Sequence, residues 1–300
     1  MRIVVYGAGA LGSVVGALLS RRHEVTLVGR KAHVEAIARH GLAVSGCVEE
    51  VFVPKAAERL SDAGAADAII ITVKAYDTEK AIEEIRSLGE GKTLIVSLQN
   101  GLGLQELYRK AFRGRTVVGV TSMGAMMIAP GSVCYAGEGE TRFAPLEEGD
   151  AAAVTMAEAF EGVGMEAGVS EDIEREIWMK VVVNSAINPL TALVRQKNGY
   201  VLKDQGLLSL AIETCQESTA VAIASGIDLD QQAMVEKLMD VLHKTSENKS
   251  SMLQDLEKRR RTEIEEITGE VVARGERVGV AVPLNRTLLR LLRSLPNQAQ

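Results

Sequence analysis

The feature that most restricts the fold is a glycine turn near the start of the chain. Residues 2–6 read RIVVY, a run of strand length. It is followed by Gly7, Ala8, Gly9, Ala10, Leu11 and Gly12, and then by a helix-like stretch. In such a unit the first glycine permits the tight turn, the second lets a pyrophosphate approach the backbone, and the third lets helix and strand pack closely. A second apolar run, EVTLV at 24–28, supplies the context that makes the motif specific. The pattern predicts a dinucleotide site, and a glycine turn without a ligand is the alternative.

Short apolar runs rich in β-branched residues alternate with helix-length stretches up to about residue 169. The runs lie at 2–6, 24–28, 67–72, 93–98 and 116–120, and the helix-length stretches at 10–21, 77–87 and 102–112. Nearly continuous apolar runs suit strands that are buried on both faces, and their alternation with helices predicts a parallel sheet. Short strands and glycines between 132 and 168 are expected to complete this sheet.

Helical periodicity dominates the rest of the chain, beginning with a capping pattern at Ser170. Helices are expected at 171–186, 189–196, 205–225, 230–244, 253–277 and 284–294. A chain of 300 residues usually forms more than one core. The sequence therefore predicts an α/β Rossmann-type N-terminal domain with a parallel sheet, residues 1–169, followed by an all-helical C-terminal domain, residues 170–300.

Charge and cysteine content exclude several classes of protein. The formal net charge is -6, and the basic triplet at 259–261 is bracketed by acids, so we expect neither a nucleic-acid nor a membrane partner. Cys47, Cys134 and Cys215 show neither metal nor redox spacing, which predicts free thiols, no metal site and a cytoplasmic location. No stretch is expected to reach membrane-spanning length, and the early glycines argue against a signal peptide.

The end of the second predicted strand selects the cofactor. An acid there would bind the ribose 2′-hydroxyl of NAD, whereas an arginine accommodates the 2′-phosphate of NADP. This chain has VGRK, with Arg30 and Lys31 and no acid. The sequence therefore predicts NADP (NADPH), and a solvated surface role for Arg30 is the alternative.

Two further loops follow predicted strands, at the edge where open α/β sheets bind ligands. Lys74 follows the strand at 67–72, and Gln99, Asn100 and Gly101 follow the strand at 93–98. Lys74 either meets the cofactor or lies in water. Asn100 and Gly101 either form a plain turn or contribute to the predicted cofactor crevice, and their position favours the second interpretation.

One apolar stretch of the helical region carries polar residues at regular spacing. Residues 177–192 read IWMKVVVNSAINPLTA, and Lys180, Asn184 and Asn188 would share one side of a helix. Reduction of a carbonyl by hydride transfer creates an alkoxide, and a lysine ammonium in a cleft can stabilise that charge and supply the proton. The alternative is that Lys180 extends to solvent and the amides bond to nearby backbone.

A second polar cluster occurs near the end of the chain. Ser251 and Asp255 are four residues apart, and on one expected helix Glu263 lies three turns beyond Ser251. A carboxylate there could orient Lys180 or accept a hydrogen bond from a substrate hydroxyl. Alternatively, Glu263 belongs to a solvated acidic face with Glu265 and Glu266.

With these residues in view, the chain resembles the ketopantoate reductase (2-dehydropantoate 2-reductase) family over nearly its whole length. The resemblance rests on GAGALG, VKAY, SLQNGLG, WMKVVVNSAINPLTAL and SSMLQDLEKRRRTEIEEITGEV, in that order. It implies a Rossmann domain, a helical domain and an active site between them. The implied activity is reduction of ketopantoate to D-pantoate with NADPH, on the route to pantothenate and coenzyme A.

The resemblance also implies residue roles. Lys180 would be the general acid, and Glu263 would bind a substrate hydroxyl and help to arrange the site. Asn100, Asn184, Asn188 and Ser251 would hold the substrate, with Asn100 also touching the nicotinamide ribose. The cofactor would be bound by the turn from Gly7 to Gly12, by Arg30 and by Lys74.

The resemblance is incomplete at two places. TSMGA at 121–125 has Met123 where many members of the family carry a histidine, and CYAGEGETRFAP at 134–145 is a loose match to the usual glycine-rich hairpin. These differences bear on the identity of the 2-oxo acid more than on the type of reaction. A reductase of another 2-oxo acid and a non-catalytic NADP-binding protein of the same fold are therefore the alternatives. The sequence leaves a monomer and a homodimer equally open.

Overall fold

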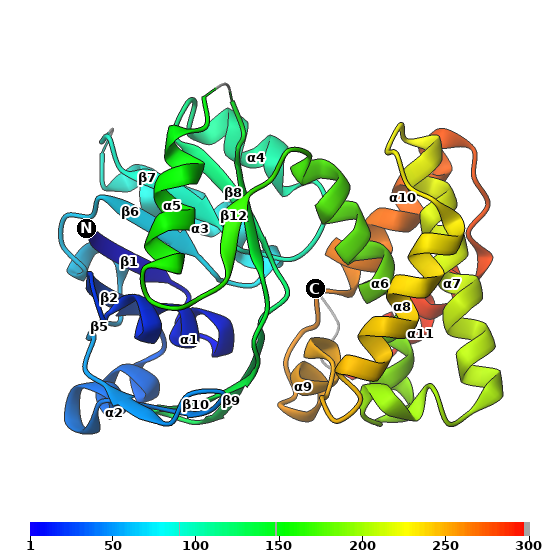
Figure 1. Cartoon of the computed structure of the whole chain (residues 1–300), viewed down its shortest axis with the longest axis horizontal. Coiled ribbons are helices and arrows are strands. Elements are labelled where there is room, and N and C mark those ends of the chain that lie inside the picture. Colours follow the sequence, from blue (N-terminus) through cyan, green and yellow to red (C-terminus); the bar gives the residue numbers. More distant parts are fainter. Residues whose placement is uncertain (90, 148, 297–300) are drawn as a thin grey trace. The chain divides into compact units, whose positions relative to one another are not determined.

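The computed structural model describes residues 1–89, 91–147 and 149–296 and divides the chain into two compact units. The first unit comprises Met1–Gln99 and Leu104–Ile173 and is built around a sheet, whereas the second comprises Asn100–Gly103 and the chain from Glu174 on and is built of helices (Figure 1). The chain enters the helical unit for good at Glu174, inside a helix, a little beyond the expected boundary at 169. The early excursion at 100–103 has no counterpart in the sequence-based division.

The first unit contains an eight-stranded sheet in the order β12-β11-β8-β7-β6-β1-β2-β5. Neighbouring strands are parallel except for β8 and β11, which are antiparallel. The strands are β1 (Arg2–Tyr6), β2 (Glu24–Val28), β5 (Lys55–Ala57), β6 (Ala68–Ile71), β7 (Leu94–Ser97), β8 (Thr116–Thr121), β11 (Thr141–Pro145) and β12 (Ala167–Val169). The sheet confirms the predicted fold class.

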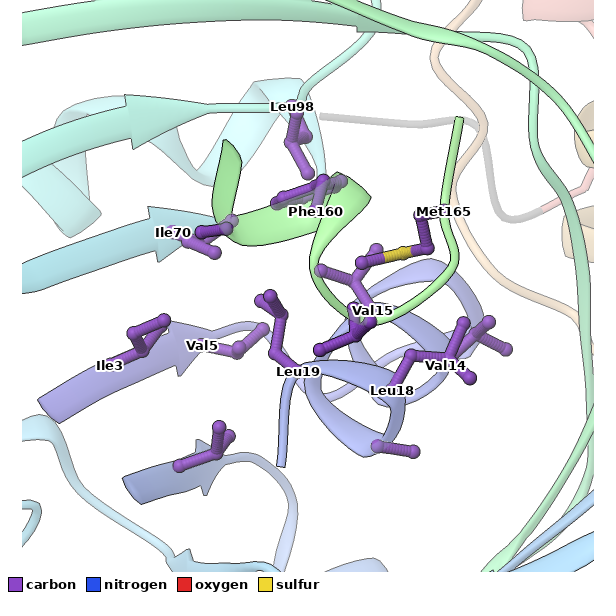
Figure 2. Packing of buried hydrophobic residues seen from close by; sticks show 14 of the residues in the cluster. Ile3, Val5, Val14, Val15, Leu18, Leu19, Ile70, Leu98, Phe160 and Met165 are labelled. Atoms are coloured by element: carbon purple, nitrogen blue, oxygen red, sulfur yellow. The ribbon is translucent and has the colours of Figure 1, made fainter. Parts of the chain in front are cut away.

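Helices cover this sheet and bury the central strands. They are α1 (Ala10–Leu19), α2 (Lys31–His40), α3 (Thr78–Ser87), α4 (Leu104–Ala111) and α5 (Ala151–Glu161), with 3₁₀ turns at Leu60–Asp62 and Ala75–Asp77. Side chains of α1, including Leu19, gather with Val5 of β1, Ile70 of β6 and Phe160 of α5 (Figure 2). Consecutive residues of β1 and β6 are buried, which is why these strands read as continuous apolar runs.

A second, four-stranded sheet in the order β4-β3-β10-β9 also belongs to the first unit. Its strands are β3 (Leu42–Gly46), β4 (Glu50–Phe52), β9 (Gly124–Ala129) and β10 (Ser132–Gly137). The expectation that residues 132–168 complete the main sheet is therefore wrong for β10, because β10 pairs with β9 and β3 instead. Among the described residues of that region, β11 and β12 are the strands that join the main sheet.

The helical unit contains α6 (Ile173–Val194), a 3₁₀ turn (Asn198–Tyr200), α7 (Gln205–Ala224), α8 (Gln231–Lys244), α9 (Ser251–Glu257), a π-helical turn, η4 (Glu265–Gly269), α10 (Glu270–Val278) and α11 (Pro283–Arg293). The two helices expected at 171–186 and 189–196 are one helix that continues through Pro189. Most residues around Pro189 are buried, and this packing outweighs the cost of a proline, about 3 kcal/mol in a helix interior.

The single helix expected at 253–277 is also wrong. α9 ends at Glu257, and Arg259 adopts a φ of 52°, a left-handed conformation that an α-helix cannot continue through. The N–H of Arg260 turns back to the carbonyl of Asp255 at 2.8 Å. Helical structure resumes near Ile264, so Ser251 and Glu263 lie on different elements.

Among the described residues, α6 is the one helix whose length and composition would allow it to cross a membrane. This differs from the expectation that no stretch reaches that length. Of its most apolar window, 72% is buried inside the protein, and a core helix passes the same test. α6 is accordingly a largely buried helix of its unit.

The core around α1 makes a specific prediction about stability. Leu19 is fully buried in it, so Leu19→Ala should lower the free energy of unfolding by about 3 kcal/mol through lost burial and a residual cavity. Leu291→Ala is the control, since Leu291 on α11 is 47% exposed and its truncation should cost less than about 1 kcal/mol. Urea unfolding followed by circular dichroism measures both, and equal effects would contradict the assigned core.

Candidate active site

The residues predicted to bind the cofactor follow the carboxyl ends of neighbouring parallel strands. The last residues of β2, β1, β6 and β7 are in register: Val28, Tyr6, Ile71 and Ser97. The glycine turn follows β1, Arg30 follows β2 and Lys74 follows β6, while Gln99 and then Asn100 follow β7. The first unit therefore brings the glycine turn, Arg30 and Lys74 to the sheet edge outside which ligands bind in folds of this class.

The glycine turn is held tightly against the sheet. Gly7 has a φ of +116°, which side-chain-bearing residues rarely adopt, and the N–H groups of Gly7 and Ala8 both donate to the carbonyl of Val28. A Cβ on Gly12 would clash with the carbonyl oxygen of Gly7 and with Oγ1 of Thr72. The first and third glycines are thus explained by packing within the protein.

Gly9 is different, because packing does not explain it. The nearest atom to a Cβ built on Gly9 is the carbonyl oxygen of Gly7, at 3.8 Å, so the protein leaves room for a side chain there. Gly9 is also the N-cap of α1, whose first N–H groups have no partner within the helix. A pyrophosphate approaching the backbone at Gly9 would use this space and these donors, so the residues present fit a dinucleotide.

Two cationic side chains flank the turn. Arg30 is exposed and occupies the N-cap position of α2, beside Lys31 and with no acid at the end of β2. Lys74 is partly buried and precedes the 3₁₀ turn at Ala75–Asp77. The positive charge at Arg30 suits the 2′-phosphate of NADP, and the role of Lys74 stays a prediction.

The helical unit supplies the titratable group. Lys180 lies on α6 and is largely buried, with Asn184 and Asn188 one and two turns further along. Burial lowers the pKa of Lys180 to about 8, and the nearby charge of Glu263 opposes this shift by stabilising the ammonium. A lysine tuned to this range holds a proton at neutral pH and can release it to a substrate oxygen.

Glu263 acts on Lys180 from a different structural element than the expected one. It lies just before the helical segment that begins at Ile264, and its carbonyl accepts from the N–H of Ile267 at 3.1 Å. Only 5% of the residue is exposed, which rules out the alternative of a solvated acidic face. The expected shared helix face with Ser251 is wrong, although the carboxylate does act on Lys180.

The remaining substrate candidates belong to the same unit. Asn188 is buried, whereas Asn184 and Ser251 are partly exposed. Ser251 begins α9, and its neighbour Ser250 caps that helix by accepting from the N–H of Leu253.

A hydroxyl pair that the sequence did not predict links α6 to α9. Oγ1 of Thr191 on α6 donates to Oγ of Ser250 at 2.8 Å, and both residues are buried. This bond holds the start of α9, with Ser251, against α6 one turn beyond Asn188. The sequence did contain a signal for this bond, because Thr191 lies in the apolar stretch three residues after Asn188.

Asn100 also belongs to the helical unit, through the segment Asn100–Gly103. The N–H of Leu102 donates to the carbonyl of Glu266 at 3.1 Å, in the π-helical turn. A Cβ on Gly101 would lie 2.8 Å from the same carbonyl oxygen, so only glycine fits without displacement. The structure thus groups Asn100 with Lys180 and Glu263.

Met123 is buried in the hydrophobic core of the first unit, with 9% of its surface exposed. Its N–H donates to Oγ1 of Thr121 at 3.2 Å. The side chain that replaces the histidine of the resemblance therefore packs as a core residue.

The electrostatic link between Lys180 and Glu263 can be measured directly. In Glu263→Gln the pKa of Lys180 should fall below about 8, because the removed carboxylate is the group that raises it. Lysine labelled with ¹³C at Cε reports this pKa through its chemical shift during a pH titration. Glu213→Gln, at an exposed position on α7, is the control, and an unchanged or higher pKa in Glu263→Gln would contradict the link.

Comparison with known proteins connects both units to one family. The family model described as ketopantoate reductase PanE/ApbA matches residues 3–148, and that of ketopantoate reductase PanE/ApbA C terminal matches residues 172–295. A 2-dehydropantoate 2-reductase of Archaeoglobus fulgidus is 40% identical over 98% of this chain and 97% of its own length.

Solved structures agree with this assignment. The crystal structure of 2-dehydropantoate 2-reductase from Geobacter metallireducens has a TM-score of 0.91 and 30% identity over 98% of this chain and 99% of that chain. A structure of D-mandelate dehydrogenase with NADH and anilino(oxo)acetate has a TM-score of 0.91 and 28% identity over 98% of this chain and 97% of that chain. The resemblance read from the sequence motifs is confirmed: the chain belongs to the ketopantoate reductase family.

Proposed function

We propose that this protein is an NADPH-dependent 2-dehydropantoate 2-reductase, which reduces ketopantoate to D-pantoate for pantothenate and coenzyme A biosynthesis. The observation that carries the proposal is the chemistry of Lys180, whose pKa is lowered to about 8 while Glu263 stabilises its charged form. The open position at Gly9 and the cation at Arg30 support the use of NADPH as the cofactor. We expect the enzyme to act in the cytoplasm on a small 2-oxo acid.

Each residue then has a defined task in the reaction. When bound, NADPH supplies the hydride that adds to the C2 carbonyl carbon of the substrate. The ammonium of Lys180 would stabilise the charge that develops on the carbonyl oxygen and then give that oxygen a proton. A pKa of about 8 keeps most of the lysine protonated at neutral pH and makes it a stronger acid than an unperturbed lysine.

Glu263 and the amides would position the substrate. The carboxylate of Glu263 would accept a hydrogen bond from the substrate hydroxyl and keep Lys180 charged. Asn100, Asn184 and Asn188 provide both donors and acceptors, which suit a carboxylate and a hydroxyl group, and Ser251 adds a hydroxyl.

A second candidate function is the reduction of another 2-oxo acid by the same chemistry. The structural likeness to D-mandelate dehydrogenase, at a TM-score of 0.91, favours it. The 2-oxo acid that corresponds to mandelate carries a phenyl ring instead of the branched hydroxylated side chain of ketopantoate. A buried carboxylate such as Glu263 has no hydrogen-bond partner on a phenyl ring, and this favours the hydroxylated substrate.

Steady-state kinetics with a panel of 2-oxo acids tests the proposal. Ketopantoate should show the highest kcat/KM, ahead of phenylglyoxylate and of unbranched 2-oxo acids. Lys180→Ala should lower kcat for ketopantoate by about 10²- to 10⁴-fold, the usual contribution of a general acid, while equilibrium binding of NADPH stays close to that of the wild type. Turnover of ketopantoate no faster than of simple 2-oxo acids would reject the substrate, and full activity of Lys180→Ala would reject the mechanism.

Arg30 makes a separate prediction about the cofactor. Arg30→Asp should reverse the preference for NADPH over NADH, because an aspartate repels the 2′-phosphate and accepts a hydrogen bond from the 2′-hydroxyl. The ratio of kcat/KM for the two cofactors should change by about 100-fold or more. Arg39→Asp, at an exposed position on α2, is the matched control. An unaltered ratio in Arg30→Asp would remove Arg30 from the phosphate site.

A further inference from the structure

We propose that Gln99 is a positioning residue, which fixes the backbone at Val73 and thereby holds Lys74 at the cofactor site. The side chain of Gln99 bridges the loop after β7 to the loop after β6, and both loops lie at the edge that carries the glycine turn. This inference deepens the proposed function and rests on it, because the loop it concerns is the one assigned to NADPH.

The amide of Gln99 is bonded on both sides. Its Nε2 donates to the carbonyl of Val73 at 3.0 Å and to Oγ1 of Thr78 at 2.9 Å. Its Oε1 accepts from the hydroxyl of Tyr108 and from Oγ of Ser97, the latter at 3.2 Å. Nε2 also lies 3.5 Å from the carbonyl oxygen of Lys74, so the nitrogen has three acceptors and the oxygen has two donors.

The orientation of the amide follows from its partners. The carbonyl of Val73 can only accept, so the nitrogen of Gln99 must face it. The hydroxyl of Thr78 donates to the carbonyl of Ala75 at 2.7 Å, so its oxygen can only accept from Gln99. No alternative side chain of similar size offers two donors on one side and an acceptor on the other.

The residues that hold the amide are themselves buried. Tyr108, Thr78 and Ser97 are each at most 3% exposed, and the ring of Tyr108 stacks on Phe112 with centroids 6.5 Å apart. Burial raises the pKa of the Tyr108 hydroxyl, which keeps it a neutral donor. The four groups form a satisfied network of the kind that fixes one geometry.

The network acts on the backbone beside the glycine turn. Oγ1 of Thr72 donates to the carbonyl of Gly7 at 2.8 Å, and a Cβ on Gly7 would clash with the backbone nitrogen of Val73. Val73 is thus held between Gly7 on one side and Gln99 on the other. Lys74 follows directly and leads into the turn at Ala75–Asp77. The position of its side chain therefore depends on these two contacts of Val73, which together form a clamp.

Equilibrium binding of NADPH, measured by fluorescence titration, tests the clamp without involving the chemical step. Gln99→Glu keeps the shape of the side chain, but its carboxylate cannot donate to Val73 or Thr78. NADPH should bind about tenfold more weakly. Lowering the pH should partly restore binding in this variant relative to the wild type, because the protonated acid regains one donor. Gln216→Glu, at an exposed position on α7, is the matched control and should bind as the wild type does.

A double-mutant cycle with Lys74→Ala separates positioning from general structural damage. If Gln99 acts through Lys74, Gln99→Glu should weaken binding by less than about twofold when Lys74 is already alanine. Additive losses, or normal binding by Gln99→Glu, would overturn the proposal.

Two further measurements keep the outcomes distinct. Should Gln99→Glu fail to fold, Tyr108→Phe removes one donor to the amide oxygen of Gln99 and should still weaken NADPH binding about threefold. Unchanged binding in Tyr108→Phe would then overturn the proposal. The wild type tests the proposed function on its own: if it neither binds NADPH nor reduces ketopantoate, the reductase assignment fails, whatever the variants show.

Discussion

The close contact between the glycine turn and the backbone of Thr72 and Val73 is the constraint on which the cofactor edge depends. Gly7 and Gly12 have no side chains, so the turn, the start of α1 and the loop after β6 meet at backbone distance. Bulkier residues would separate β1 from β6 at the point where their carboxyl ends adjoin. The space left at Gly9 has meaning only because its neighbours are fixed in this way.

The helical unit depends on a different balance, between the cost of burying an ammonium and the charge that stabilises it. Burial alone would drive Lys180 toward its neutral form, and Glu263 limits that tendency. Both residues belong to the same unit, so their mutual distance does not depend on the other unit. Lys180 and the glycine turn are thus built by separate parts of the chain.

Local patterns in the sequence predicted what depends on local structure. The strands at 2–6 and 24–28 match β1 and β2, because burial on both faces leaves an apolar run that no other arrangement explains as well. Lys180, Asn184 and Asn188 do lie on one helix, as their spacing predicted. The roles of these residues stay predictions, since spacing specifies a face and not a ligand.

Long-range packing decided the rest. The second sheet forms from strands such as β3 and β10, which are far apart in the sequence and pair in parallel, and no local pattern announces such a partner. Pro189 suggested a helix boundary that burial overrides, and the left-handed turn at Arg259 interrupts a pattern that reads as continuous. The amide network of Gln99 could not be predicted from local patterns either, because Thr78 and Tyr108 belong to two different helices.

The segment Asn100–Gly103 has a consequence for how the protein can be divided. Because these residues pack with the helices while Gln99 and Leu104 do not, the polypeptide passes between the two units three times, near 100, 103 and 173. A fragment cut at Glu174 would leave the carbonyl of Glu266 without the N–H of Leu102. Neither half of the sequence is therefore a complete module, because the helical unit includes four residues that come from the middle of the first unit's sequence.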